Sequence, residues 1–344
     1  MSLRRTPHTV RTPARCLGIG LLVCITCWIG CGKPSDNQSK SPGSGATIRV
    51  IATTGMVADL VRAVGGERVD VVQVIGAGVD PHLYNPSRDD VALIMSGDVI
   101  FYSGLMLEGK LADTLGQVGR SKPVFAVTER IDKEYLLLPD DAAGHADPHV
   151  WMDASAWSQC VDVISEALVE FSAKDAETFR QNAAAYQSEL EELHQYAKKT
   201  LATIPRESRV MITSHDAFNY FGRAYDLEVL GVQGLSTESE AGLQQINELV
   251  DLLVQRKVRA VFTESSVSPK NIKALIEGAA AQGFEIKLGG VLFSDAMGPQ
   301  GTYEGTYVGM LDHNVTTVAR ALGGQAPESG MHGKLNSVKE HPSS

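Results

Sequence analysis

Short runs of β-branched residues alternate twice along the chain with longer segments that have helical periodicity. The first block contains IRVIAT, VDVVQVI and DVIFYS, and the second contains RVMIT, LEVLGV, RAVFTE and EIKLGG. This alternation is typical of parallel α/β units, in which a helix returns the chain to the same edge of the sheet. We therefore predict two similar parallel-sheet α/β lobes, an N-terminal lobe at 47–172 and a C-terminal lobe at 205–322.

The segment between the two blocks contains neither Gly nor Pro and is rich in Ala, Glu, Leu, Gln and Lys. It stops just before Pro205. Such a composition predicts one long helix, which we place at 173–204 as the connection between the lobes. Because a single helix couples two lobes stiffly, we do not expect the large closing motion of a hinged binding protein.

The N-terminal end has the profile of a signal peptide, which we place at 1–31. An uncharged run at 17–30 follows four arginines: Arg4, Arg5, Arg11 and Arg15. The run is shorter than the roughly 20 apolar residues that a membrane-spanning helix needs, so we predict export to the periplasm or the cell surface.

Cys31 closes the apolar run after Ile29 and Gly30, and this string resembles the lipobox at which bacterial lipoproteins are cut and acylated. Trp28 stands where leucine is usual, and Cys27 offers a rival position. We predict lipidation of Cys31, with simple cleavage or an uncleaved anchor as alternatives. The polar segment at 32–46 then forms a flexible tether beside the membrane.

The remaining composition excludes several features. A net charge of −10, without a basic stripe, argues against nucleic acid as a partner. Cys160 is the one cysteine beyond the leader, so no internal disulfide is expected. The tail at 323–344 has no apolar periodicity, and we predict that it is disordered.

Two copies of the tripeptide Asp-Pro-His supply the first candidate site residues, His82 and His149. In each copy the aspartate, Asp80 or Asp147, can accept the second imidazole N–H, which is how the tautomer of a metal-bound histidine is commonly fixed. Either histidine alone is as easily explained by an ordinary loop.

His215 and Asp295 complete the candidate site. His215 follows the predicted strand RVMIT, and Asp295 follows a strand of the second block in LFSDAMG. Parallel α/β folds place their ligands at the carboxyl ends of strands, so two residues from each block would converge between the lobes.

Three imidazoles and a carboxylate suit zinc, manganese, iron or cobalt, whereas calcium and magnesium prefer oxygen ligands alone. Four protein ligands fill a tetrahedral ion and leave no position for the water that a catalytic zinc needs. The sequence therefore indicates a site that holds a metal and not an enzyme.

Further motifs make the chain resemble the cluster A-I solute-binding proteins, the zinc and manganese receptors of ABC importers. They are ATTGMVADLVRAVGG, GVDPHLYNPSRDD, SGLMLEG, DPHVWMD, SHDAFNYFGRAY, STESE, FTES, LFSDAMG and YVGMLDHN. The resemblance implies two α/β lobes, a rigid connecting helix, and one metal bound at the positions of His82, His149, His215 and Asp295. It also implies that Glu264, in FTES, lies near the metal as an auxiliary ligand or as an orienting residue.

The resemblance further implies an ABC permease and its ATPase as partners, and we expect a monomer. The metal is cargo; zinc is favoured over manganese because many manganese receptors carry glutamate at the position of His215. No organic cofactor is expected. A surface adhesin and a zinc-dependent enzyme are the alternative functions.

Overall fold

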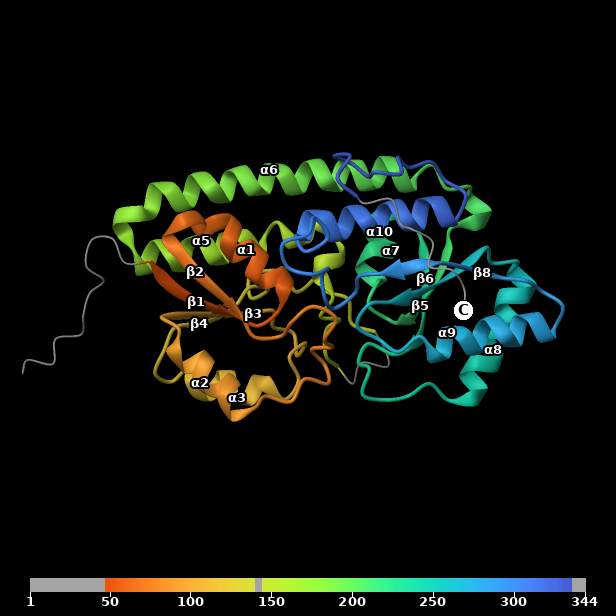
Figure 1. The fold of residues 1–344 in the computed structure, drawn as a ribbon, viewed down its shortest axis with the longest axis horizontal. Helices are drawn as coiled ribbons and strands as arrows, with labels where there is room; N and C mark the ends of the chain where they lie inside the picture. The colour runs from red at the N-terminus through yellow and green to blue at the C-terminus, as the bar shows by residue number, and fades with distance from the viewer. Residues whose placement is uncertain (1–46, 140–143, 336–344) are drawn as a thin grey trace, which may run out of the picture. The chain divides into compact units, whose positions relative to one another are not determined.

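The computed structural model describes residues 47–139 and 144–335, and two four-stranded parallel sheets confirm the predicted fold class. The strand order in the N-terminal lobe is β2-β1-β3-β4 (Figure 1). Its strands are β1 (Ile48–Ala52), β2 (Val69–Gln73), β3 (Val99–Tyr102) and β4 (Val124–Ala126).

The second sheet repeats this arrangement with the order β6-β5-β7-β8, again entirely parallel. Its strands are β5 (Val210–His215), β6 (Glu228–Gln233), β7 (Ala260–Glu264) and β8 (Lys287–Leu292). In both lobes the first strand lies in the interior of the sheet, so the chain order reverses beside it. Crevices at the carboxyl ends of strands near such reversals are where open α/β sheets bind ligands.

Helices cover both faces of each sheet. The N-terminal lobe contains α1 (Gly55–Gly65), α2 (Arg88–Ser96), α3 (Leu111–Val118), α4 (Ala154–Trp157) and α5 (Cys160–Phe171). The rest of the described chain adds α6 (Ala176–Leu201), α7 (Asn219–Tyr225), α8 (Leu243–Arg256), α9 (Lys270–Ala281) and α10 (Tyr307–Ala321).

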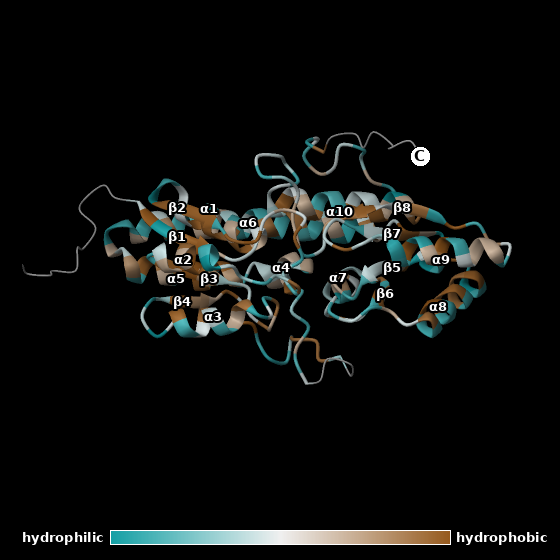
Figure 2. Cartoon of the chain, turned by 60° about the horizontal axis from the view of Figure 1, so that its bottom comes forward, coloured by the Kyte–Doolittle hydropathy of each residue, from teal (hydrophilic) through white to brown (hydrophobic). Residues whose placement is uncertain are grey.

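Alternation along the strands decides which layer each side chain joins. In β1, Val50 points into the core shared with α1 and α5, whereas Ile51 packs with residues of α2 and α3. In β5, Met211 and Ile212 divide in the same way between two apolar layers. Figure 2 shows the resulting pattern, with brown strands inside and teal polar faces on the outer helices. Period-two patterning therefore produces a three-layer lobe on each side.

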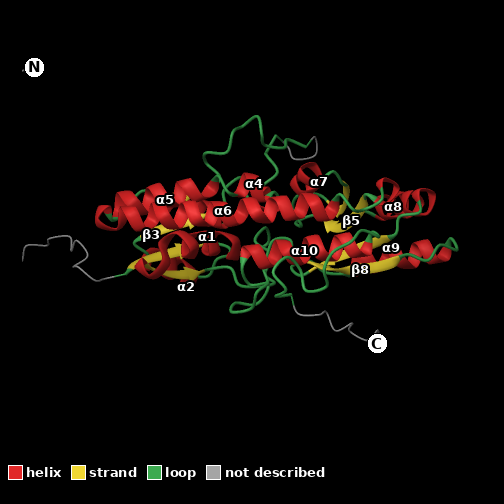
Figure 3. Cartoon of the chain, turned by 90° about the horizontal axis from the view of Figure 1, so that it is seen from above, coloured by secondary structure: helices red, strands yellow, loops and turns green. Residues whose placement is uncertain are grey.

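The long helix α6 connects the lobes, as the lack of Gly and Pro predicts. Its 26 residues span about 39 Å at the α-helical rise, so it runs alongside both sheets (Figure 3). One face is buried at helical spacing: Phe179, Ala183, Tyr186, Leu190, Leu193, Ala197 and Leu201. A short 3₁₀ turn, Ala173–Asp175, precedes it, and the chain leaves the helix before Pro205.

A second helix, α10, reinforces this connection. It packs beside α6, touches β8 in the C-terminal lobe, and also contacts α1 in the N-terminal lobe (Figures 1 and 3). The partly buried carboxylate of Asp59 in α1 accepts hydrogen bonds from the Tyr186 hydroxyl of α6 and the Tyr307 backbone N–H of α10. Three helices are thus tied at one point, and the largest apolar core continues through both lobes on this side.

The C-terminal segment differs from the sequence prediction over 323–335, because this part packs on the protein. The backbone N–H of Gln325 donates to the Thr203 hydroxyl, and that of Met331 donates to both carboxylate oxygens of Asp312. Leu335 is buried. Side-chain acceptors on α10 and after α6 hold a segment that has no periodicity of its own. Residues 336–344 lie outside the described residues.

The predicted leader, Cys31 and the tether likewise lie outside the described residues. Within the part of the chain that is described, none of the helices combines the length and the apolar character needed to cross a bilayer.

Replacing Leu190 by Ala should destabilise the metal-free protein by about 3 kcal/mol, because it leaves a cavity where α6 meets the core of both lobes. Urea unfolding followed by circular dichroism measures this change. The control is Glu192→Ala on the exposed side of α6, which should alter stability by less than about 0.5 kcal/mol. Equal effects of the two substitutions would show that burial on α6 contributes little.

Candidate metal centre

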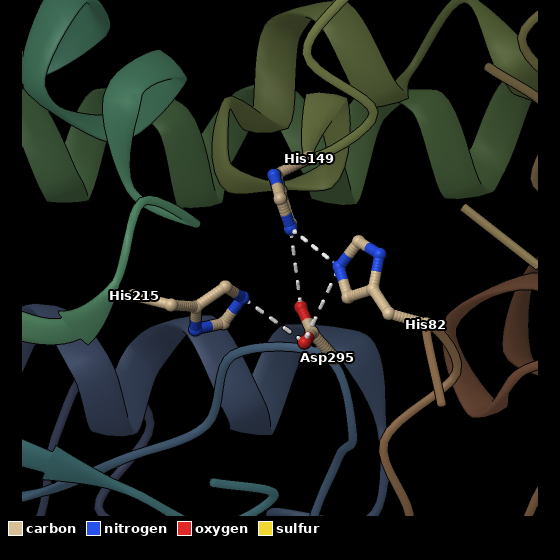
Figure 4. Close-up of side chains that lie close together, drawn as sticks. All are labelled: His82, His149, His215 and Asp295. Carbon is tan, nitrogen blue, oxygen red and sulfur yellow. Dashed lines mark hydrogen bonds and ion pairs between the residues drawn. The ribbon is translucent and has the colours of Figure 1, made fainter. Parts of the chain in front are cut away.

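The four predicted site residues come from both lobes and lie close together (Figure 4). His82 lies in the loop after β2, and His149 immediately precedes a 3₁₀ turn, Val150–Met152. His215 is the last residue of β5, and Asp295 follows β8. Each residue offers one donor atom, and the four donor atoms all lie within 4.8 Å of one another.

The carboxylate of Asp295 lies among the three imidazoles. Its Oδ2 is 3.1 Å from His215 Nε2 and 3.8 Å from His82 Nε2, while its Oδ1 is 3.4 Å from His149 Nε2. The Nε2 atoms of His82 and His149 are 3.3 Å apart. All three histidines therefore present the same ring nitrogen to one point.

Several polar atoms of this cluster are buried without hydrogen bonds. Among the described residues, His215 Nε2 and both carboxylate oxygens of Asp295 lack a partner in hydrogen-bonding geometry, although their contacts are short enough for ion pairs. An unsatisfied buried polar atom costs about 1–3 kcal/mol, and more when it is charged. A cation at the centre would satisfy all of these atoms together, so the geometry is that of a metal site.

The far side of two imidazoles is held by a carboxylate. His149 Nδ1 is 2.7 Å from Asp147 Oδ1, and His215 Nδ1 is 2.5 Å from Glu264 Oε2. When Nδ1 carries the proton and donates to these oxygens, the lone pair of Nε2 faces the centre, as metal coordination requires. Glu264 ends β7, and its other oxygen accepts the backbone N–H of His215. Glu264 thus orients His215 from behind the ring.

These carboxylates also make the centre attractive to positive charge. Burial lowers the pKa of His149, but Asp147 and Asp295 outweigh it and raise that pKa to about 9. Burial likewise opposes the charged form of His215, while Glu264 and Asp295 raise its pKa well above the usual value. The pKa of Asp295 is held well below its usual range, because His215 and His149 outweigh its burial.

His82 differs from the other two histidines. Burial lowers its pKa to about 4, although Asp295 partly opposes this shift. The sequence-based expectation for Asp80 is wrong, because its Oδ1 accepts the backbone N–H of His82 at 2.8 Å and not an imidazole N–H. Its Oδ2 accepts from the hydroxyl of Thr237, a distant residue that the sequence reasoning did not single out.

His82 also lines a cleft of about 850 Å³. Residues of the loop before α3 form one wall, including Met106 and Lys110, and the segment after β6, including Glu238, forms another. His82 keeps 5% of its surface exposed while His149 and His215 are fully buried, so His82 is the residue of the cluster that borders the cleft. Another cavity, of about 840 Å³, lies between α7 and α8 and contains none of the four residues.

The fold and this centre define a two-lobed α/β protein with a buried cluster of three histidines and one carboxylate that could hold a metal ion. A family model described as "Zinc-uptake complex component A periplasmic" matches residues 50–321. The chain therefore belongs to this family of metal-binding substrate receptors of ABC importers.

The matches to individual relatives extend over nearly the whole length of each relative. The manganese-binding lipoprotein MntA of Bacillus subtilis is 46% identical over 293 residues, which are 85% of this chain and 94% of that protein. The zinc-binding protein TroA of Treponema pallidum is 40% identical over 306 residues, 89% of this chain and 96% of the relative. The solved structure of periplasmic zinc-binding TroA superposes with a TM-score of 0.78 at 42% identity, covering 80% of this chain and 99% of that one.

Replacing Glu264 by Gln should weaken metal binding by about tenfold or more, because the amide cannot supply the negative charge that orients and polarises the His215 ring. Competition with a chelator of known affinity measures the change. Glu238→Gln is the matched control, since Glu238 is exposed at the cleft and should leave affinity unchanged. Comparable losses in both variants would point to the general negative field and not to the contact with His215.

Proposed function

We propose that this protein captures one divalent transition-metal ion outside the cytoplasm and delivers it to the permease and ATPase of an ABC importer. The observation that carries this proposal is the buried carboxylate of Asp295, which has no hydrogen bond among the described residues and is surrounded by three imidazole nitrogens. The names of its relatives, which describe manganese-binding and zinc-binding proteins, support it.

The proposed ligands are Nε2 of His82, His149 and His215 and the carboxylate of Asp295. Four protein donors fill a tetrahedral coordination shell, which suits a site that holds its ion. A hydrolytic zinc would instead need an open position for water, so the same count of donors supports a receptor over an enzyme. All four donors come from one chain, which agrees with function as a monomer.

Zinc is the first candidate for the cargo and manganese the second. Three nitrogen donors make the site softer than an oxygen-rich one, and affinity at such sites rises from manganese toward zinc. Among the relatives, the 46% identical protein is named for manganese and the 40% identical one for zinc, so both ions belong in the test.

The proposed organisation places lobes at 47–172 and 205–322 around a connecting helix at 173–204. Export, removal of the leader and lipidation at Cys31 would leave the receptor at the outer side of a membrane. The polar tether at 32–46 would then give it reach toward its permease.

The purified protein should contain one equivalent of metal, and His215→Ala or Asp295→Ala should abolish it, because each removes a donor and leaves the other buried groups unpaired. His82→Ala should weaken binding at least about tenfold. Mass spectrometry of protein prepared without chelator or a metal-affinity tag measures the content, and competition between zinc and manganese ranks the two ions.

His145→Ala is the control for these variants, because this exposed histidine lines the cleft but is not among the four converging residues. It should retain one equivalent. If the wild-type protein binds no metal even after reconstitution, the receptor function is wrong, and the adhesin alternative moves ahead.

Cys31→Ser should move the protein from the membrane fraction to the soluble exported fraction, because serine has no thiol to form the thioether that would carry the lipid. Fractionation of bacteria that express each variant, followed by immunoblotting, measures this distribution. Cys27→Ser is the matched control and should remain with the membrane. The opposite pattern would identify Cys27 as the modified residue.

A further inference from the structure

We propose that each Asp-Pro-His tripeptide is a latch between the lobes, and that Thr237 is the positioning residue that sets how fast the metal is released. In this use, a latch is an aspartate that binds its own histidine segment with one oxygen and a side chain of the C-terminal lobe with the other. The proposal rests on the function proposed above and deepens it.

The first half of each latch is local. Oδ1 of Asp80 accepts the backbone N–H of His82 at 2.8 Å, and Oδ1 of Asp147 accepts the backbone N–H of His149 at 2.9 Å. The same turn therefore fixes the backbone of both N-terminal ligands. The repeated tripeptide has one shared geometry, which a proline between the two residues helps to restrict.

The second half of each latch crosses between lobes. Oδ2 of Asp80 accepts the hydroxyl of Thr237 at 2.5 Å, and Oδ2 of Asp147 accepts the side-chain N–H of Asn219 at 3.1 Å. Thr237 lies after β6, and Asn219 is the first residue of α7, which begins shortly after His215. Each of these hydrogen bonds therefore fixes the position of one N-terminal histidine relative to the C-terminal lobe, which supplies the other two ligands.

The two latches differ in strength. Asp147 is fully buried, also binds the imidazole of His149, and has a backbone oxygen that accepts the Tyr220 hydroxyl. The Arg223 guanidinium lies 5.0 Å from the centre of the Tyr220 ring and donates to the Tyr135 backbone oxygen, which further ties this region together. The latch at His149 is therefore redundant.

Among the described residues, Asp80 of the latch at His82 makes one hydrogen bond across the lobes, with the hydroxyl of Thr237. This latch stands at the cleft, whose walls include His82 on one side and residues 234–236 on the other. Because His82 is the ligand nearest the open side, its departure gives an ion the shortest way out. Breaking the Thr237 contact frees the His82 segment while the other latch keeps His149 beside His215 and Asp295.

This arrangement makes a specific kinetic prediction for Thr237→Val, which keeps the shape of the side chain and removes its hydroxyl. Zinc release should become about tenfold faster, because a hydrogen bond to a charged group is lost near the leaving ligand. Thr237→Ser restores the hydroxyl and should release zinc close to the wild-type rate. Stopped-flow transfer of zinc from the full chain, purified in detergent, to an excess of coloured chelator measures the rates.

Ser239→Ala is the matched control, because this exposed serine lies in the same loop. It should release zinc as the wild type does. Thr237→Ala is measured as well, so that the conclusion does not depend on one substitution, and it should match Thr237→Val. Thermal unfolding of the chelator-treated proteins measures separately what the Thr237 hydroxyl contributes to the metal-free fold.

The outcomes separate this proposal from the receptor function. Absence of zinc from the wild-type protein would reject the function itself. One equivalent of zinc with wild-type release from Thr237→Val and Thr237→Ala would reject the latch and leave the receptor intact. Fast release from Ser239→Ala would also reject it, because the effect would then belong to the loop and not to the contact of Thr237 with Asp80.

Discussion

The carboxylate of Asp295 is buried at the meeting point of three imidazoles without a hydrogen bond among the described residues, and the rest of the site is arranged around it. Such a group is unfavourable in a protein interior unless positive charge is close. Asp147 and Glu264 add further negative charge behind His149 and His215. The centre therefore favours a cation over any neutral ligand. The imidazole nitrogens direct that preference to transition-metal ions.

Such a centre requires a scaffold that keeps the lobes in place, so that the buried imidazoles and carboxylate do not shift and hydrogen-bond to one another. Helix α6 runs along both lobes, α10 packs beside it, and Asp59 joins both helices to α1. The apolar core on this side is continuous between the lobes. Because three helices and a continuous core hold this side together, a change that admits or releases an ion is more easily made in the loops that carry His82 and Thr237.

The same fold explains why, in both latches, a side chain of the C-terminal lobe supports a histidine of the N-terminal lobe. The N-terminal histidines lie on loops after their strands, whereas His215 ends β5 itself and its ring is held by Glu264 at the end of the neighbouring β7. Loop ligands need support from outside their own lobe. Asn219 and Thr237 supply this support from the C-terminal lobe. Because several contacts hold the latch at His149 and fewer hold the latch at His82, His82 is the histidine that can move more easily.

Local chemistry in the sequence was sufficient to predict the fold class, the long helix and the four residues that the structure brings together, because strand alternation, helix propensity and the repeated Asp-Pro-His are all short-range patterns. It did not predict the packing of 323–335, which depends on Asp312, nor the bridging role of α10. It also assigned Asp80 the wrong partner. The contact of Asp80 with Thr237 joins residues 157 positions apart, and that of Asp147 with Asn219 joins residues 72 apart. Only the tertiary structure decides such pairings, because the free energy of a hydrogen bond between distant residues depends on how the two lobes pack together, and no short-range pattern records that.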